Sequence, residues 1–124
     1  MKRVAPALCL ALLAASPALA AAGEMSVATF LAKADALKAK GAMALFSPDI
    51  KVLQQEGQAA GMAYKAQLDA ERAQGRPSSC PPKNPKVSSD QVLAHLRTYP
   101  AAQRPAVTMR AAIGDMFKKT WPCR

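Results

Sequence analysis

The stretch SPDIKVLQQEGQAAGMAYKAQLDAERAQGRP, residues 47–77, decides the fold. Ser47 followed by Pro48 is a common helix start, since serine caps the first turn and proline suits its first position. Apolar residues then recur at helical spacing until a glycine and a proline stop the pattern. We therefore expect one long helix over residues 48–74. Its apolar face would consist of Ile50, Leu53, Gly57, Ala60, Gly61, Tyr64 and Leu68.

Gly57 and Gly61 lie four residues apart on one face of this helix. Each glycine costs about 1 kcal/mol of helix stability relative to alanine, so a packing reason is expected. A residue without a Cβ lets another backbone approach closely. We therefore expect helix crossing at Gly57 and Gly61, within the chain or across a dimer, rather than contact with a cofactor.

The chain before residue 47 predicts a shorter helix over residues 27–40. Ser26 is its candidate N-cap, and Gly41 suits the left-handed conformation that often follows a helix. Residues 42–46 are all apolar and are interpreted as one more helical turn.

The chain after residue 88 predicts two further helices, over residues 89–99 and 105–119. Ser88 and Gln91 have the spacing of a capping box at the start of the first. Pro105 suits the opening position of the second. Their apolar faces would consist of Val92, Leu93, Leu96 and Tyr99, and of Met109, Ala112, Ile113, Met116 and Phe117.

Residues 75–88 form a connector rich in proline and serine, which excludes regular helix. No run of useful length alternates with a period of two, so no strand is predicted. We expect an all-α protein: a small, bundle-like domain of four helices over residues 21–124, held by one core and one disulfide.

Residues 1–20 have the pattern of a secretory signal peptide. Lys2 and Arg3 form the basic start, residues 4–15 are apolar apart from one proline, and small alanines precede the expected cleavage after residue 20 or 22. The apolar run is too short to span a bilayer as a helix. We expect the cleaved protein to be periplasmic or secreted.

Cleavage would leave two cysteines, Cys80 and Cys123. An even pair in a small exported chain predicts a disulfide, and two free thiols are the alternative. A zinc site is a poor match, because His95 is the only histidine. On the loop-entropy model the disulfide should stabilise the fold by roughly 4 kcal/mol.

The charge is strongly basic, with 17 Lys+Arg against 8 Asp+Glu in 124 residues. Only Lys2 and Arg3 are charged within residues 1–20, so cleavage lowers the formal net charge from +9 to +7. Residues 21–75 are balanced, and the whole excess lies in residues 76–124. Such a surface attracts polyanions. Export argues against nucleic acid and leaves cell-wall polymers, anionic lipids or acidic proteins, with a merely solvated face as the alternative.

No pattern of catalytic residues stands out. His95 lies at the edge of an apolar helix face, where a lone histidine is usually a half-buried packing residue. Paired carboxylates, a phosphate-binding glycine loop and clustered metal ligands are absent from the sequence pattern. We therefore expect no enzyme activity, no metal and no cofactor.

The second half has a distinctive layout. Cys80-Pro81-Pro82 opens it, a helix ending in His95-Leu96-Arg97-Thr98-Tyr99-Pro100 follows, and Trp121-Pro122-Cys123 closes it. Over residues 79–123 the chain resembles the Rap/Tai group of exported helical immunity proteins. The founding members of that group neutralise peptidoglycan amidase effectors delivered by type VI secretion.

The resemblance implies an all-helical, disulfide-clipped and often dimeric protein that binds another protein. Position by position, it extends to the pair Cys80 and Cys123 and to the helix bearing His95, Arg97 and Tyr99, which we interpret as candidate partner-binding residues. The leading hypothesis is an exported binding protein that inhibits an amidase effector, with a homodimer left open. The alternative is an envelope-associated structural protein whose basic C-terminal half contacts anionic cell wall or lipid.

Overall fold

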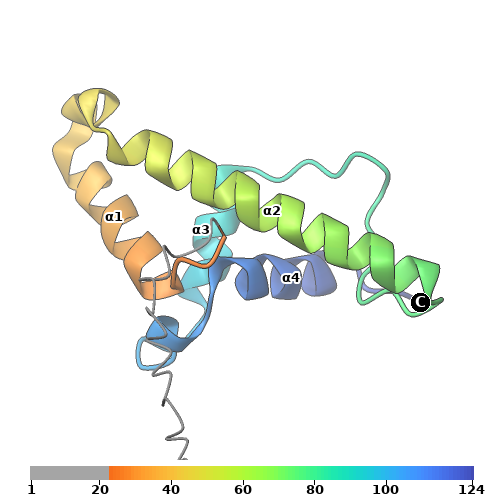
Figure 1. Ribbon diagram of the computed structural model, residues 1–124. Helices are drawn as coiled ribbons and strands as arrows, with labels where there is room; N and C mark the ends of the chain where they lie inside the picture. The colour runs from red at the N-terminus through yellow and green to blue at the C-terminus, as the bar shows by residue number, and fades with distance from the viewer. Residues whose placement is uncertain (1–22) are drawn as a thin grey trace, which may run out of the picture.

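The computed structural model describes residues 23–124 (Figure 1). This part of the chain is all-α, as predicted, with four α-helices, two short 3-10 helices and no strand. The predicted signal peptide, residues 1–20, lies outside the described residues. None of the helices between residues 23 and 124 combines the length and the apolar character needed to cross a bilayer. The elements are α1 (Val27–Lys40), η1 (Gly41–Phe46), α2 (Asp49–Ala73), α3 (Ser89–Arg97), η2 (Arg104–Ala106) and α4 (Met109–Thr120).

The first three α-helices begin and end close to the predicted positions. The Ser26 hydroxyl accepts a hydrogen bond from Thr29 N at the start of α1, and Gly41 ends that helix with a φ of 58°. Ser88 and Gln91 form the predicted capping box of α3. At the start of α2, the Ser47 hydroxyl accepts a hydrogen bond from Asp49 N at 3.3 Å. Local capping chemistry therefore sets the starts of α1 and α3, whereas the N-cap of α2 is Pro48, which makes no side-chain hydrogen bond.

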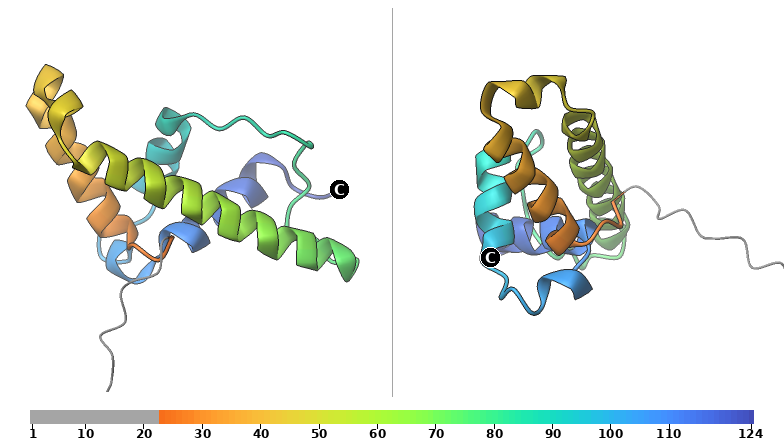
Figure 2. Two further views of the ribbon diagram at one scale, coloured as in Figure 1. Left: turned by 45° about the horizontal axis from the view of Figure 1, so that its top comes forward. Right: turned by 90° about the vertical axis from the view of Figure 1, so that its left-hand side faces the viewer.

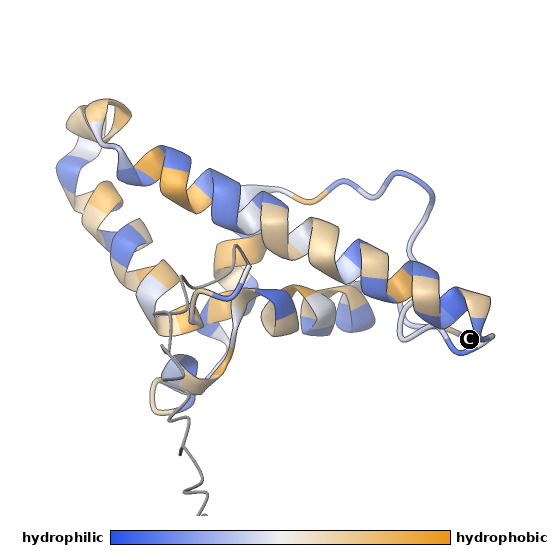
Figure 3. Cartoon of the chain, viewed as in Figure 1, coloured by the Kyte–Doolittle hydropathy of each residue, from blue (hydrophilic) through white to orange (hydrophobic). Residues whose placement is uncertain are grey.

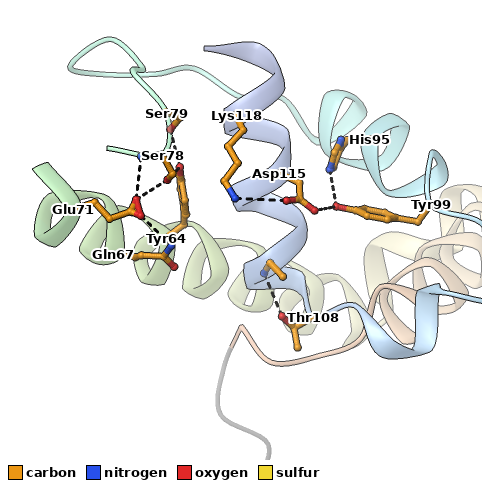
Figure 4. Close-up of polar contacts among 11 residues, drawn as sticks. Tyr64, Gln67, Glu71, Ser78, Ser79, His95, Tyr99, Thr108, Asp115 and Lys118 are labelled. Carbon is orange, nitrogen blue, oxygen red and sulfur yellow. Dashed lines mark hydrogen bonds and ion pairs between the residues drawn. The ribbon is translucent and has the colours of Figure 1, made fainter. Parts of the chain in front are cut away.

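The predicted start of the fourth helix at residue 105 is wrong. Pro105 opens only the short η2, and α4 begins at Met109, where the Thr108 hydroxyl accepts a hydrogen bond from Ala111 N (Figure 4). Val107 is extended because its carbonyl accepts a hydrogen bond from Val27 N at 2.8 Å. This pairing with the N-terminal segment prevents one continuous helix from residue 105.

The N-terminal segment lies against the start of α4. Met109 N donates to Met25 O at 2.8 Å, and Arg110 N donates to Gly23 O at 3.0 Å. Met25 N donates in turn to the Glu56 carboxylate at 2.7 Å. Glu56 is 8% exposed and is a buried acid within α2 that was not predicted. Gly23 also has a φ of 91° and lies so close to Ala60 that a Cβ would be 3.2 Å from its backbone.

One core joins all four α-helices. α4 packs along the second half of α2, while α1 and α2 diverge from η1 instead of lying side by side over their length (Figures 1 and 2). The fold is thus a four-helix cluster around one core, opened between α1 and α2. The buried apolar side chains are those of Val27, Phe30, Leu31, Ala60, Tyr64, Leu68, Leu96, Met109, Ala112, Ile113 and Met116.

The C-terminal end is fixed by the predicted disulfide between Cys80 and Cys123, with Cα atoms 5.0 Å apart. Cys80 N also donates to Trp121 O at 2.8 Å. The bridge therefore joins the connector, residues 74–88, to the residues that follow α4. This finding confirms the disulfide prediction.

Tyr64 of α2 forms hydrogen bonds with two serines of the same connector (Figure 4). Its hydroxyl lies 2.7 Å from Ser79 Oγ and 2.9 Å from Ser78 Oγ. Because Ser78 Oγ donates to the Glu71 carboxylate, Ser78 accepts from Tyr64, and Tyr64 accepts from Ser79. The hydrogen bond from the Ser78 hydroxyl is the main cause that lowers the pKa of Glu71, and bonds from the Gln67 side chain and Ser78 N add to it. The ring of Tyr64 packs against Phe117, with ring centroids 5.2 Å apart.

Candidate functional site

An apolar groove of about 780 Å³ lies where α1 and α2 diverge, and residues of α1, α2 and α3 line it. The right-hand view of Figure 2 shows the backbone of these three helices, with α1 between α3 and α2. Residues of the connector and of α4 complete the walls. The lining residues are Phe30, Ala34, Leu37, Ile50, Leu53, Gln54, Gly57, Gln58, Gly61, Pro85, Val87, Ser88, Ser89, Val92, Leu93, Ile113, Met116 and Phe117.

Gly57 and Gly61 line this groove and are not helix-crossing points within the chain. A Cβ built on either glycine would meet no atom within 4 Å. Within residues 23–124 the prediction of close crossing is therefore wrong, because no second backbone comes near the two glycines; crossing in a dimer stays a prediction. What the two glycines do provide is open volume along the groove.

Among the glycines within the α-helices, Gly114 of α4 packs tightly, since a Cβ would lie 3.2 Å from two ring carbons of Tyr64. Gly61→Ala should raise the free energy of unfolding by about 1 kcal/mol, since it adds helix propensity without a clash. Gly114→Ala should lower it, since hydrogen bonds and Phe117 hold the Tyr64 ring in place. Thermal melts of the two variants should shift in opposite directions. A higher melting temperature for Gly114→Ala would contradict this packing.

The second prominent feature is an apolar tip formed by η1 between α1 and α2 (Figures 1 and 3). Met43, Leu45 and Phe46 are 65%, 79% and 81% exposed. Residues 41–46 contain no charged or polar side chain. Single exposed apolar residues are ordinary, but three large ones on one projecting turn are typical of an interaction surface. We call Met43, Leu45 and Phe46 the tip.

The three residues predicted to bind a partner make contacts within the chain. His95 is 8% exposed, and its Nε2 lies 3.2 Å from the Tyr99 hydroxyl (Figure 4). Because the Tyr99 hydroxyl donates to Asp115 at 2.6 Å, it accepts from His95 Nε2–H. Burial, followed by the Asp115 carboxylate, raises the pKa of Tyr99 well above its ordinary value. This hydrogen-bonded cluster joins α3 to α4.

Arg97, the third of these residues, forms an ion pair with Asp35 of α1 at 2.7 Å. The hydrogen bond from Arg97 lowers the pKa of Asp35. Arg110 likewise pairs with Glu24 at 3.2 Å. Two arginines of the basic half thus pair with acids of the balanced half. A partner-binding role for His95, Arg97 and Tyr99 stays a prediction.

Burial lowers the pKa of His95 below its ordinary value, and the nearby Lys119 ammonium lowers it further. A backbone hydrogen bond at Ala112 and the Asp115 charge raise this pKa and offset part of the decrease. The unfolded chain therefore binds this proton more readily than the folded chain. The associated stability should be lost as the pH falls through about 6.5. The loss should be smaller in His95→Gln, which does not titrate.

Urea unfolding of the oxidised protein at pH 7.5, 6.0 and 5.0 would measure this dependence. Acids such as Asp35, whose pKa is lowered, lose their contribution only at lower pH, below about 4. An equal decrease for wild type and His95→Gln between pH 7.5 and 5.0 would show that His95 is not the group responsible.

His95 also lines a smaller cavity of about 270 Å³. Thr120 contributes the hydroxyl that lines this cavity. This hydroxyl donates to Met116 O at 2.8 Å and not to the His95 imidazole. Within residues 23–124, no three potential metal ligands lie together.

The sequence patterns did not single out the groove or the tip as functional features. The unexplained cost of Gly57 and Gly61 was a signal for the first, and the uncharged segment at residues 42–46 was a signal for the second. Neither pattern shows by itself which apolar residues remain uncovered after folding. Comparison with protein-family models, curated proteins and solved structures finds no significant match to this chain.

Proposed function

We propose that this chain is an exported, non-catalytic binding protein that docks onto a protein partner through its tip. The observation that carries the proposal is the exposure of Met43, Leu45 and Phe46, at 65–81%. Large apolar side chains, aromatic ones above all, are the usual anchors of protein interfaces. A projecting apolar turn suits insertion into a concave surface of another protein.

The tip is held in a defined shape before any partner binds. Gly41 turns the chain at the end of α1, and its N–H donates to Lys38 O. Ser47 N donates to Ala44 O at 2.9 Å at the other end of η1. Below the tip, Lys33 of α1 and Asp49 of α2 form an ion pair at 3.3 Å. A preorganised anchor loses less conformational entropy on binding, which favours affinity.

The resemblance to the Rap/Tai group supports a more specific form of the proposal, in which the partner is a peptidoglycan amidase effector and the tip enters its substrate cleft. The uncharged surface of η1 suits this role, because it requires no matching charge within the cleft. The disulfide would keep the rest of the fold rigid in an oxidising compartment.

Purified type VI amidase effectors from the same organism provide the test. A stoichiometric amount of the oxidised protein should stop hydrolysis of peptidoglycan by its cognate amidase. Phe46→Glu and Leu45→Glu should abolish inhibition without loss of fold, because both side chains are exposed. Met62→Glu is the matched control, since Met62 is 72% exposed on α2.

Two results would overturn this proposal. One is undiminished activity of every effector amidase in the presence of excess protein. The other is equal inhibition by wild type and the two tip variants. Binding to cell wall that disappears in 0.5 M salt, without any amidase inhibition, would instead support the envelope-associated alternative, since salt screens surface charge.

A further inference from the structure

We propose that the tip of one copy of this chain occupies the groove of a second copy, and that this reciprocal contact forms a dimer in which both tips are masked. The inference rests on the proposed function, because it describes how access to the same tip would be regulated. A partner protein and a second copy of the chain would compete for Met43, Leu45 and Phe46.

The tip cannot enter the groove of its own chain. η1 connects α1 directly to α2, and these two helices form walls of the groove. Hydrogen bonds from Gly41 N to Lys38 O and from Ser47 N to Ala44 O fix the two ends of η1. The three side chains of the tip are accordingly 65–81% exposed. A tip that occupies the groove must therefore come from another molecule.

The groove offers an apolar surface of suitable size. Its volume of about 780 Å³ lies within the range of roughly 300–1,000 Å³ that is usual for binding pockets, so several side chains can enter it. Gly57 and Gly61 add room, because a Cβ built on either glycine meets no atom within 4 Å. No charged side chain lines the groove, so an uncharged tip fits it without burying a charge.

The area that such a contact would bury reaches what a specific dimer requires. A large apolar side chain that becomes buried removes on the order of 100 Å² of apolar surface from water. The side chains of two tips would therefore bury about 600 Å², and the groove walls that they cover would add a similar area. The total of about 1,200 Å² lies at the lower limit for specific protein interfaces and predicts a dissociation constant in the micromolar range.

A second copy is favoured over an unrelated partner, because one symmetric contact covers both apolar surfaces. In an isologous dimer the tip of each copy meets the groove of the other. The chain is basic, with 17 Lys+Arg against 8 Asp+Glu, so two copies repel each other. Burial of apolar surface must therefore drive the contact, and added salt should strengthen it by screening this repulsion.

Sedimentation equilibrium of the oxidised protein tests the proposal, and the wild type should dimerise at micromolar concentrations. Phe46→Glu brings a charge into the groove and Gly61→Leu fills it, so each should weaken dimerisation by about tenfold or more. Met62→Glu and Ala66→Leu are the matched controls, since both positions are exposed on α2 outside the groove lining. Melting temperatures establish that all variants fold.

An equimolar mixture of Phe46→Glu and Gly61→Leu separates this dimer from other arrangements. The heterodimer retains one contact, between the tip of the Gly61→Leu copy and the groove of the Phe46→Glu copy, so the mixture should associate more tightly than either variant alone. A dimer that only Gly61→Leu disrupts would be a crossing of two α2 helices, and one that only Phe46→Glu disrupts would join two tips. Either pattern overturns the proposal, as does a dimer that weakens in 0.5 M NaCl.

Amidase inhibition distinguishes the failure of this inference from the failure of the proposed function. Gly61→Leu keeps its tip, so it should inhibit the cognate amidase at least as well as the wild type. A wild type that inhibits the amidase but stays monomeric at about 1 mM would overturn only the masking of the tip. A wild type that dimerises through tip and groove but inhibits no amidase would overturn only the proposed function.

Discussion

Replacing Cys80 and Cys123 together with serine should lower the free energy of unfolding by about 4 kcal/mol. The bridge closes a sequence separation of 43 residues, and its main effect is to limit the conformations of the unfolded chain. For a domain of about 100 residues this corresponds to a decrease in melting temperature of roughly 20 °C. Differential scanning calorimetry of the two proteins under oxidising conditions would measure it.

Reductant provides the internal control for this experiment. Dithiothreitol should lower the melting temperature of the wild type to that of the double variant and should leave the double variant unchanged. The hydrogen bond from Cys80 N to Trp121 O needs no sulfur, so part of the local geometry should survive. A wild-type melting temperature that is insensitive to reductant would show that the bridge contributes nothing to stability.

Tyr64→Ala should have a comparable effect, lowering the free energy of unfolding by about 3–5 kcal/mol. The side chain is 2% exposed, and its ring fills the space between Gly114 and Phe117. Truncation leaves a cavity between α2 and α4. It also removes the hydrogen-bond acceptor of Ser79, a residue with no exposed surface. Urea unfolding of the oxidised variant is the appropriate measurement.

Tyr64→Phe separates the two contributions. It keeps the ring and removes only the hydroxyl, so a decrease of about 1–3 kcal/mol is expected from the unpaired serine. Tyr99→Phe is the comparison, because Tyr99 is less buried and its hydroxyl bonds to His95 and Asp115 instead. A Tyr64→Phe variant as stable as the wild type would show that the hydrogen bonds of Tyr64 with Ser78 and Ser79 contribute nothing to stability.

The features that the sequence predicts best are local. The start of α2 after Ser47, the capping box at Ser88 and the glycine after α1 depend on neighbouring residues alone. The disulfide was predictable because export would leave two cysteines, and a pair has one way to combine. In such cases the relevant interactions lie within a few residues or follow from simple counting.

The features that the sequence failed to predict depend on distant segments. Pro105 is a good helix start, but the pairing of Val107 with Val27 overrides it. Glu56 lies on the buried stripe of α2 with Ala60 and Tyr64, but its burial depends on the distant Met25 N–H, which donates to its carboxylate. The close-packed glycine is Gly114 instead of Gly61, because which helix face meets a neighbour is decided by the arrangement of all four helices.

The same limit applies to the candidate sites. The apolar residues at positions 42–46 predict a helical turn, but they do not indicate whether the rest of the fold covers that turn. Likewise, the face of α2 that bears Gly57 looks like a packing face until the angle between α1 and α2 is known. Only the folded arrangement shows that the tip and the groove are left uncovered.

The contacts between residues 23–27 and residues 107–110 have a consequence for biogenesis. A polypeptide is synthesised from its amino end. Residues 23–27 are therefore synthesised early, whereas their hydrogen-bond partners, residues 107–110, are synthesised much later. The native contacts can form only after residues 107–110 have been released. In an intermediate in which these residues are not yet released, residues 23–27 would lack their hydrogen-bond partners.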